Sequence, residues 1–245
     1  MDAEDTARAR SWVEQARRLV VLTGAGVSAE SGVPTFRDAQ TGFWAQYRAE
    51  EMATEAGFRA QPERVWDWYQ YRRTLLAQVQ PNAGHVALAG LARRRPGVLT
   101  LVTQNVDGLH QQAGSEGVLC LHGDLRSDRW LDAPRNCCNP AHLTPGSPPR
   151  CPACGNPRRP GVVWFGEALP WQILAQAQKA AQACDVMLVV GTAGAVYPAA
   201  GLAHLARQSG AHVVVLNPAP SELDDTAHLL LRGTSAQWLP HLLGF

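Results

Sequence analysis

The chain of 245 residues is 46% apolar and 18% charged, which is enough apolar sequence for one or two globular domains with a substantial core. Its 22 lysines and arginines against 21 aspartates and glutamates give a net charge of +1, which provides no long-range attraction to nucleic acid or anionic lipid. We therefore expect neither direct nucleic-acid binding nor membrane association. The acidic residues 1–5 lack the basic start of a secretory signal, which predicts a cytoplasmic protein with reduced thiols.

Short apolar runs alternate with helical patterns along the chain. The runs are apolar at consecutive residues, which is typical of strands covered on both faces, and they lie at 19–22, 98–102, 118–121, 186–190 and 212–216. Helical spacing occurs at 4–18, 171–183, 198–208 and 235–243. This alternation predicts an α/β fold built on a doubly wound parallel, Rossmann-like sheet. Glycines and Pro198 interrupt the apolar window 186–203, so we expect a strand and a helix start there rather than a membrane span.

Two segments break the alternation and predict a smaller inserted domain. Residues 35–79 have a helical pattern, whereas 124–160 are rich in Pro, Cys and Arg and have little periodicity. A long segment of the second kind needs something such as a metal to order it. We expect a larger domain formed by residues 1–34, 80–123 and 161–245, and a smaller helical plus zinc-binding domain formed by 35–79 and 124–160.

The first predicted strand ends in a glycine-rich loop. Residues 24–29 read Gly-x-Gly-x-x-Ala, a spacing that lets backbone N–H groups approach a pyrophosphate at a helix N-terminus. A dehydrogenase would continue with a crossover helix, a second strand and an acidic residue about 20 positions on. Residues 30–38 are instead rich in turn formers and contain Phe36, Arg37 and Asp38, which disfavours hydride transfer.

This loop closely resembles the cofactor loop of the sirtuins, the NAD-dependent protein lysine deacylases. The resemblance covers nearly the whole chain and continues, in order, through Thr103–His110, Leu121–Gly123, Val162–Glu167, Gly191–Thr192 and Val196–Ala199. Five further ordered motifs make coincidence negligible.

Polar residues at the ends of the predicted strands supply the expected NAD site, because ligands of an open α/β sheet bind outside the carboxyl ends of its strands. The resemblance implies that NAD is a co-substrate, held bent with its glycosidic bond exposed. The implied contacts are Gly24, Ala25, Gly26, Ala29, Phe36, Arg37, Gln104, Asn105, Asp107, Gly191, Thr192, Asn217, Ser235 and Ala236. Asn217 lacks the acidic residue that often follows it in the family.

His122 ends a predicted strand beside Gly123, and an unperturbed pKa of about 6.5 suits a histidine to proton abstraction near neutral pH. The resemblance makes it the general base. The acyl oxygen of acyl-lysine attacks the anomeric carbon as nicotinamide leaves, and the histidine then activates a ribose hydroxyl. The implied products are free lysine, nicotinamide and O-acyl-ADP-ribose.

Acyl-lysine proteins are the expected substrates. The β-prone run 162–165 can pair with an extended peptide through main-chain hydrogen bonds, and the resemblance places Val163, Phe165, Gly166 and Glu167 nearest the substrate. Tyr69 and Arg72 lie three positions apart on one helix face and resemble the signature of sirtuins that remove succinyl, malonyl and glutaryl groups. An arginine can grip the carboxylate that ends those acyl chains. The small Ala49 and Ala53 leave room for the longer chain.

The cysteines predict one structural zinc ion. Cys151 and Cys154 form a Cys-x-x-Cys knuckle suited to two corners of a tetrahedral site. The family's first Cys-x-x-Cys is missing, and the nearest thiols are the adjacent Cys137 and Cys138. Either both of these complete the site, or Cys138 and His142 do, or the metal has been lost.

Two other functions compete with deacylation. An NAD glycohydrolase or ADP-ribosyltransferase would use the same pocket, but the intact substrate run 163–167 disfavours it. A non-catalytic NAD sensor would not need both His122 and the complete Gln-Asn-Val-Asp motif at 104–107. We expect the protein to act as a monomer.

Overall fold

A parallel sheet forms the centre of the larger part of the molecule. The computed structural model describes residues 3–34 and 49–245. Six strands there form one parallel sheet in the order β3-β2-β1-β6-β7-β8. They are β1 (Leu19–Thr23), β2 (Leu99–Thr103), β3 (Leu119–Cys120), β6 (Val186–Val190), β7 (His212–Leu216) and β8 (Leu229–Leu231). The predicted doubly wound sheet is confirmed.

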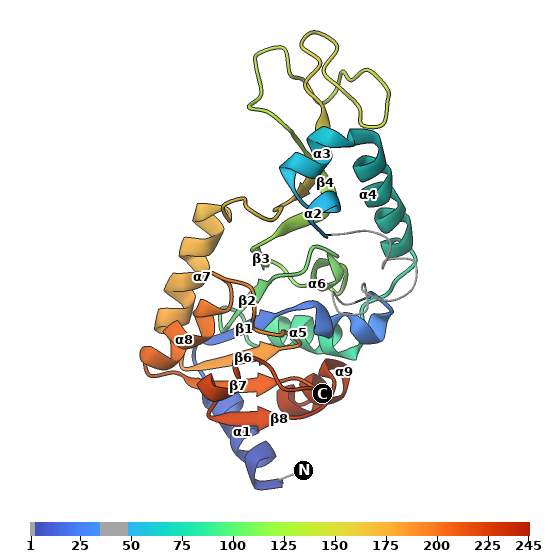
Figure 1. Cartoon of the computed structure of the whole chain (residues 1–245). Helices are drawn as coiled ribbons and strands as arrows, with labels where there is room; N and C mark the ends of the chain where they lie inside the picture. The colour runs from blue at the N-terminus through green and yellow to red at the C-terminus, as the bar shows by residue number, and fades with distance from the viewer. Residues whose placement is uncertain (1–2, 35–48) are drawn as a thin grey trace.

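Helices cover both faces of this sheet (Figure 1). Leu19 and Val21 of β1 pack into one core, and Val20 and Leu22 pack into the other, each side chain at most 2% exposed. Burial of each such side chain contributes roughly 1.5 to 3 kcal/mol, which explains the consecutive apolar pattern. The first core also contains α1 (Ala3–Gln15), α5 (Ala83–Arg94) and α9 (Ser235–Leu243), and the second contains α7 (Trp171–Ala183) and α8 (Gly201–Gln208).

A smaller unit lies beyond the β3 edge of the sheet (Figure 1). It contains α2 (Ala49–Met52), α3 (Glu55–Ala60), α4 (Pro62–Leu76) and an antiparallel hairpin of β4 (Gly123–Trp130) and β5 (Arg158–Val162). A third core joins the helices to the hairpin through side chains that include Phe58, Tyr69, Leu125 and Trp164. Arg73 of α4 donates hydrogen bonds to the Leu125 and Ser127 carbonyl oxygens and pairs with Asp128. The predicted domain boundaries stay a prediction.

The structure differs from the sequence patterns at several elements. The patterns do not predict α5, β8 or the β4–β5 hairpin. Helix α8 begins at Gly201 rather than at 198, and α1 ends at Gln15 rather than at 18. Short segments complete the chain order: 3-10 turns at Ala25–Val27, Ala29–Ser31 and Asp224–Thr226, and the helix α6 (Leu109–Gln112). Within the described ranges, no helix is both long and apolar enough to cross a membrane.

Candidate active site

The loops after β1 and β6 meet where the strand order reverses. From β1 the chain continues to β2 and β3 on one side, whereas β6, β7 and β8 extend the sheet on the other. Such a reversal opens a crevice at the carboxyl ends of the strands. The Gly26 N–H donates to the Gly191 carbonyl oxygen at 2.8 Å. A Cβ atom at Gly24 would lie 2.7 Å from the Thr192 Cβ, and one at Gly26 would lie 2.8 Å from the Gly191 Cα.

This contact corrects one part of the sequence interpretation. The loop continues into two 3-10 turns, so within residues 24–34 the glycines do not open an α-helix whose N-terminus could meet a pyrophosphate. The glycines are required because two backbones approach closely, and the N–H of Gly26 is already used within the protein. Ala25 and Ala29 are exposed beside the crevice. Phe36 and Arg37 lie outside the described residues.

Polar residues after β2 line the same edge. The Gln104 side-chain amide donates to the Thr192 hydroxyl at 3.1 Å, which ties the β2 loop to the β6 loop. Asn105 donates to the Ser28 hydroxyl at 3.2 Å, and Ser28 donates to the Asp107 carboxylate at 2.7 Å. Ser28 is fully buried, and it is not among the site residues predicted from the sequence. The structure thus brings the predicted set 104–107 together at the crevice.

Two buried histidines support this edge from behind, and sequence reasoning missed both. His85 accepts the Asn82 N–H at Nδ1, so its Nε2 carries the hydrogen and donates to the Ser28 hydroxyl at 3.3 Å. Thr23 donates to Thr103 at 2.8 Å and therefore accepts from His110 Nε2 at 3.0 Å. The two imidazole rings lie 4.8 Å apart. The sequence has no local pattern that would bring the two histidines together, because they are 25 positions apart.

The protonation state of His110 should affect how the free energy of unfolding depends on pH. Burial and the neighbouring His85 lower the pKa of His110 to about 3, so the folded protein holds it neutral. The unfolded chain takes up this proton below a pH of about 6.5, so the free energy of unfolding should fall as the pH drops from 6.5 toward 3, by up to about 1.4 kcal/mol per pH unit. Denaturant unfolding of wild type and of His110→Gln at several pH values measures this. An unchanged pH slope in the variant would contradict the assignment.

His122 follows β3 and faces the crevice from the β3 edge. Its Nδ1 lies 2.9 Å from the Gln104 carbonyl oxygen, which can only accept, so Nδ1 carries the hydrogen and Nε2 is left as the acceptor. Burial lowers the pKa of His122 below its ordinary value, although the bond to Gln104 raises it in part. A neutral imidazole with a bare Nε2 can accept a proton from a ligand in the crevice.

The predicted substrate run begins next to His122 but is only partly a strand. Strand β5 ends at Val162. The Val163 N–H donates to the His122 carbonyl oxygen at 2.8 Å, and the Phe165 N–H donates to the Ala53 carbonyl oxygen at 2.8 Å. Phe165 is 54% exposed, so a ligand can reach it, and its contact with the substrate stays a prediction.

The Glu167 carboxylate is held within the protein. It pairs with Arg159 and with Arg129 and accepts the Trp164 N–H at 2.8 Å. These contacts lower the pKa of Glu167 against the opposing effect of burial, which is the largest single contribution. The side chain therefore fixes the turn at Gly166, whose φ is +85°. Direct contact of Glu167 with the substrate stays a prediction.

Tyr69 and Arg72 share one face of α4, as predicted. The Arg72 guanidinium carbon lies 5.6 Å from the centre of the Tyr69 ring and 4.8 Å from that of Trp68. Tyr69 is 1% exposed, and its hydroxyl accepts the indole N–H of Trp164 at 2.9 Å. The pair therefore lies next to the predicted substrate run.

The predicted NAD contacts after β7 and at the start of α9 also reach this edge. Asn217 follows β7 and donates to the Ala219 carbonyl oxygen at 3.0 Å. Ser235, which is buried, donates to the Val27 carbonyl oxygen at 3.2 Å, and the Ala236 N–H donates to the Glu30 carboxylate at 3.0 Å. The start of α9 is thereby fastened to the loop after β1.

The four predicted zinc ligands are close together. The Sγ atoms of Cys137, Cys138, Cys151 and Cys154 all lie within 4.8 Å of one another, the one metal-binding group of this kind found among the described residues. Cys138 Sγ and Cys154 Sγ are 3.6 Å apart. Zn–S bonds of about 2.3 Å in a tetrahedron require roughly 3.8 Å between sulfurs, so the donor set fits structural zinc. His142 is not in this group, which favours the set of four thiols over the alternative with His142.

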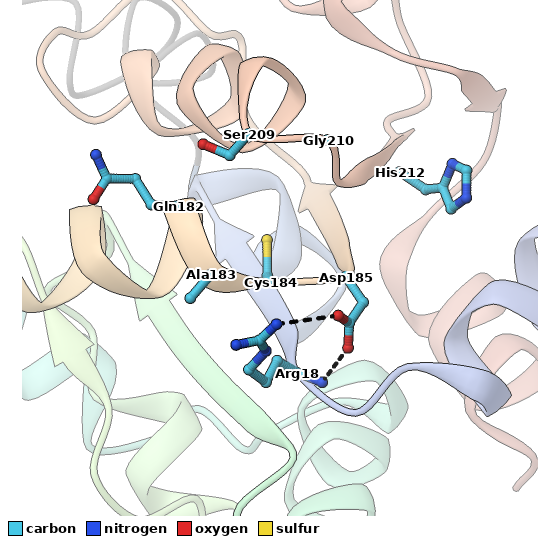
Figure 2. Close-up of a pocket in the computed structure, with 8 residues that line it drawn as sticks. All are labelled: Arg18, Gln182, Ala183, Cys184, Asp185, Ser209, Gly210 and His212. Atoms are coloured by element: carbon cyan, nitrogen blue, oxygen red, sulfur yellow. Dashed lines mark hydrogen bonds and ion pairs between the residues drawn. The ribbon is translucent and has the colours of Figure 1, made fainter.

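A separate hollow lies at the opposite edge of the sheet. Figure 2 shows it at the amino ends of β6 and β7, lined by residues that include Arg18, Asp185 and His212. Asp185 accepts the backbone N–H groups of Arg17 and Arg18 there, at 2.8 and 2.7 Å. This arrangement closes the turn before β1 and includes none of the predicted site residues.

The chain is similar over its whole length to known proteins, both in sequence and in structure. The model of the Sir2 family matches residues 24–198. A Ralstonia nicotianae protein named NAD-dependent protein deacylase is 58% identical over 242 residues, covering 99% of this chain and 97% of that protein. A solved Sir2 homolog–NAD complex superposes with a TM-score of 0.85 at 41% identity, covering 100% of this chain and 93% of that one. A Sir2 protein bound to a propionylated peptide superposes with a TM-score of 0.82 at 28% identity, covering 100% and 98%.

Proposed function

The chain belongs to the Sir2 family and is an NAD-dependent protein deacylase, and from this premise we propose that it removes succinyl, malonyl or related acidic acyl groups from lysine side chains, and acetyl groups as well. The products would be the free lysine, nicotinamide and O-acyl-ADP-ribose. The residues at the crevice support NAD as the co-substrate, and the family's solved complexes include one with NAD.

The chain's own groups suit each part of this reaction. NAD, when bound, supplies the electrophilic anomeric carbon that accepts the acyl oxygen. Gln104, Asn105 and Asp107 would hold its nicotinamide and ribose portion, and their hydrogen bonds to Thr192 or Ser28 keep the three side chains in place beforehand. His122 would take a proton at Nε2, because its Nδ1 hydrogen is committed to the Gln104 carbonyl oxygen.

The acidic acyl preference rests on Arg72. Within residues 3–34 and 49–245, no carboxylate lies within ion-pair distance of its guanidinium group, although that group is half-buried. Burial lowers the pKa of Arg72, and the opposing effects of Tyr69 and Asp107 are smaller. A cation removed from water without a paired anion is costly, so a ligand carboxylate would be strongly favoured there.

The surroundings of Arg72 fit the end of an acyl-lysine chain. Tyr69 offers a phenol on the same helix face, and α4 packs on the hairpin whose second strand leads into the substrate run. Ala53, one of the two small residues predicted to leave room, lies next to that run, because its carbonyl oxygen accepts the Phe165 N–H. An acetyl group ends in a methyl group and has no carboxylate to pair with Arg72.

Replacing Arg72 by methionine should therefore depress desuccinylation selectively. A hydrogen bond to a charged group contributes about 1.5 to 3 kcal/mol, so kcat/KM for a succinyl-lysine peptide should fall roughly 10- to 150-fold. Deacetylation of the matched acetyl-lysine peptide should change by only a few-fold. Mass spectrometry of the products formed from NAD and each peptide measures both rates.

Arg64→Met provides the matched control, because Arg64 lies on the same helix but its side chain is 43% exposed and pairs with Glu51. It should leave the succinyl-to-acetyl ratio unchanged. Equal losses of both activities in Arg72→Met, or a wild type inactive on succinyl-lysine, would refute the acidic acyl preference. Release of nicotinamide without loss of any acyl group would instead identify an NAD glycohydrolase.

A further inference from the structure

Trp164 connects the substrate run to the helix that carries Arg72. Its neighbours Val163 and Phe165 belong to the predicted peptide contacts, whereas the Trp164 ring is turned into the third core and is 1% exposed. There its indole N–H donates to the hydroxyl oxygen of Tyr69 at 2.9 Å. This is a side-chain hydrogen bond between two almost fully buried residues 95 positions apart in the chain.

The direction of this hydrogen bond determines what the Tyr69 phenol can do. An indole nitrogen can only donate, so the phenol oxygen acts as acceptor toward Trp164. The phenolic hydrogen is then left for another acceptor, and no described residue accepts it. Burial raises the pKa of Tyr69 despite the nearby Arg72, so the phenol keeps its hydrogen. Tyr69 thus keeps a phenolic hydrogen that it can donate to a ligand.

Trp164 is itself held from several sides. The Arg159 guanidinium carbon lies 3.2 Å from the centre of the Trp164 ring, and the Phe58 ring centre lies 5.2 Å away. Glu167 pairs with Arg159 and also accepts the Trp164 backbone N–H. Arg159 is 1% exposed, so this ion pair belongs to the interior. These contacts leave the indole one orientation toward Tyr69.

We propose that Trp164 is a positioning residue for acyl selectivity, which holds the Tyr69 phenol as a hydrogen-bond donor toward a carboxylate at the end of the acyl chain. This inference rests on the proposed preference for acidic acyl groups and assigns part of that preference to a residue outside the Tyr69–Arg72 pair. Without the indole N–H, nothing fixes the rotation of the phenol hydroxyl, and its hydrogen is no longer directed toward the carboxylate.

Trp164→Phe tests this, because it keeps an aromatic ring and removes the N–H. Losing one neutral hydrogen bond should raise KM for the succinyl-lysine peptide about 3- to 10-fold, with kcat and the KM for the acetyl-lysine peptide changed by less than about twofold. If this variant does not fold, benzothienylalanine placed at position 164, which replaces only the N–H by sulfur, gives the same test. Thermal unfolding of each variant establishes that it is folded.

A double-mutant cycle distinguishes positioning through Tyr69 from a general effect of the core. In a Tyr69→Phe background, Trp164→Phe should cause no further rise in the succinyl KM, because the group through which it acts is gone. Trp238→Phe is the matched control. Trp238 is a buried tryptophan of α9 whose indole N–H donates to the Arg232 carbonyl oxygen at 3.1 Å. This control should leave the succinyl-to-acetyl ratio unchanged.

The outcomes separate this inference from the proposed function. Additive effects of Trp164→Phe and Tyr69→Phe, or equal losses on both peptides, overturn the role of Trp164 while Arg72→Met still depresses desuccinylation selectively. If Arg72→Met is not selective either, or wild type does not act on succinyl-lysine, the acidic acyl preference itself fails and the inference fails with it.

Discussion

Replacing His122 by alanine should lower the rate of lysine deacylation by roughly 10²- to 10⁴-fold, the range expected when a general base is removed. The imidazole is the group at the crevice whose Nε2 is left as an acceptor, because Nδ1 is bonded to the Gln104 carbonyl oxygen. NAD should still bind, since the loops after β1, β2 and β6 are held to one another without the imidazole. Single-turnover kinetics on an acyl peptide, with NAD titrated calorimetrically, measures both quantities.

The pH profile of the wild type provides a second readout of the same group. A base must be neutral to accept a proton, and burial lowers the pKa of His122 below about 6.5. The rate should therefore persist as the pH falls through 6.5 and decline only at lower pH. His241→Ala, at an exposed histidine of α9, is the control and should leave rate and profile unchanged. Near-normal turnover by folded His122→Ala would refute the assignment of the base.

Removal of the metal-binding thiols should unfold the smaller unit. We expect the purified protein to carry about one zinc ion and the variant with Cys151→Ser and Cys154→Ser to carry none, with part of the structure lost. Structural zinc contributes its binding free energy directly to folding. The residues between β4 and β5 contain little other regular structure to hold them. Elemental analysis, together with thermal unfolding before and after a chelator, measures the effect.

Two substitutions make the zinc test specific. Cys184→Ala changes a cysteine that is 6% exposed in the second core and should leave the zinc content at one. His142→Ala should do the same, because the four thiols complete the site without it. Active, fully folded protein with no metal, or an unchanged unfolding temperature after chelation, would show that the thiols order the segment by themselves.

The sheet and its ligand edge could be predicted because their signals are local. Runs such as Val186–Val190 are apolar at every position, and that pattern requires cover on both faces wherever the strand lies. In a parallel sheet all carboxyl ends share one edge, so residues that follow the strands must gather there. Gln104 and Thr192 came together for this reason, although they are 88 positions apart.

Other features depend on contacts that no local pattern encodes. Strand β4 reads Gly-Asp-Leu-Arg-Ser-Asp-Arg-Trp, a polar run that forms a strand because Leu125 is buried in the third core and Arg73 reaches across from α4. His85 and Ser28 are separated by 57 positions, so their contact could not be read from spacing. The adjacent Cys137 and Cys138 left several ligand sets open, and the set of four thiols is favoured only by their placement relative to Cys151 and Cys154 in the fold.

The β4–β5 hairpin begins one residue after His122 and ends one residue before Val163, and a hydrogen bond joins those two residues across its base. The hydrogen-bonded base of this one hairpin therefore sets the spacing between the proton acceptor and the predicted peptide site. Residues 139–150 lie between Cys138 and Cys151 at the far end of the hairpin and do not affect this spacing. Exposed loop tips of this kind tolerate insertion. A reporter peptide could accordingly be grafted there, turning the loop into an attachment point on a working enzyme.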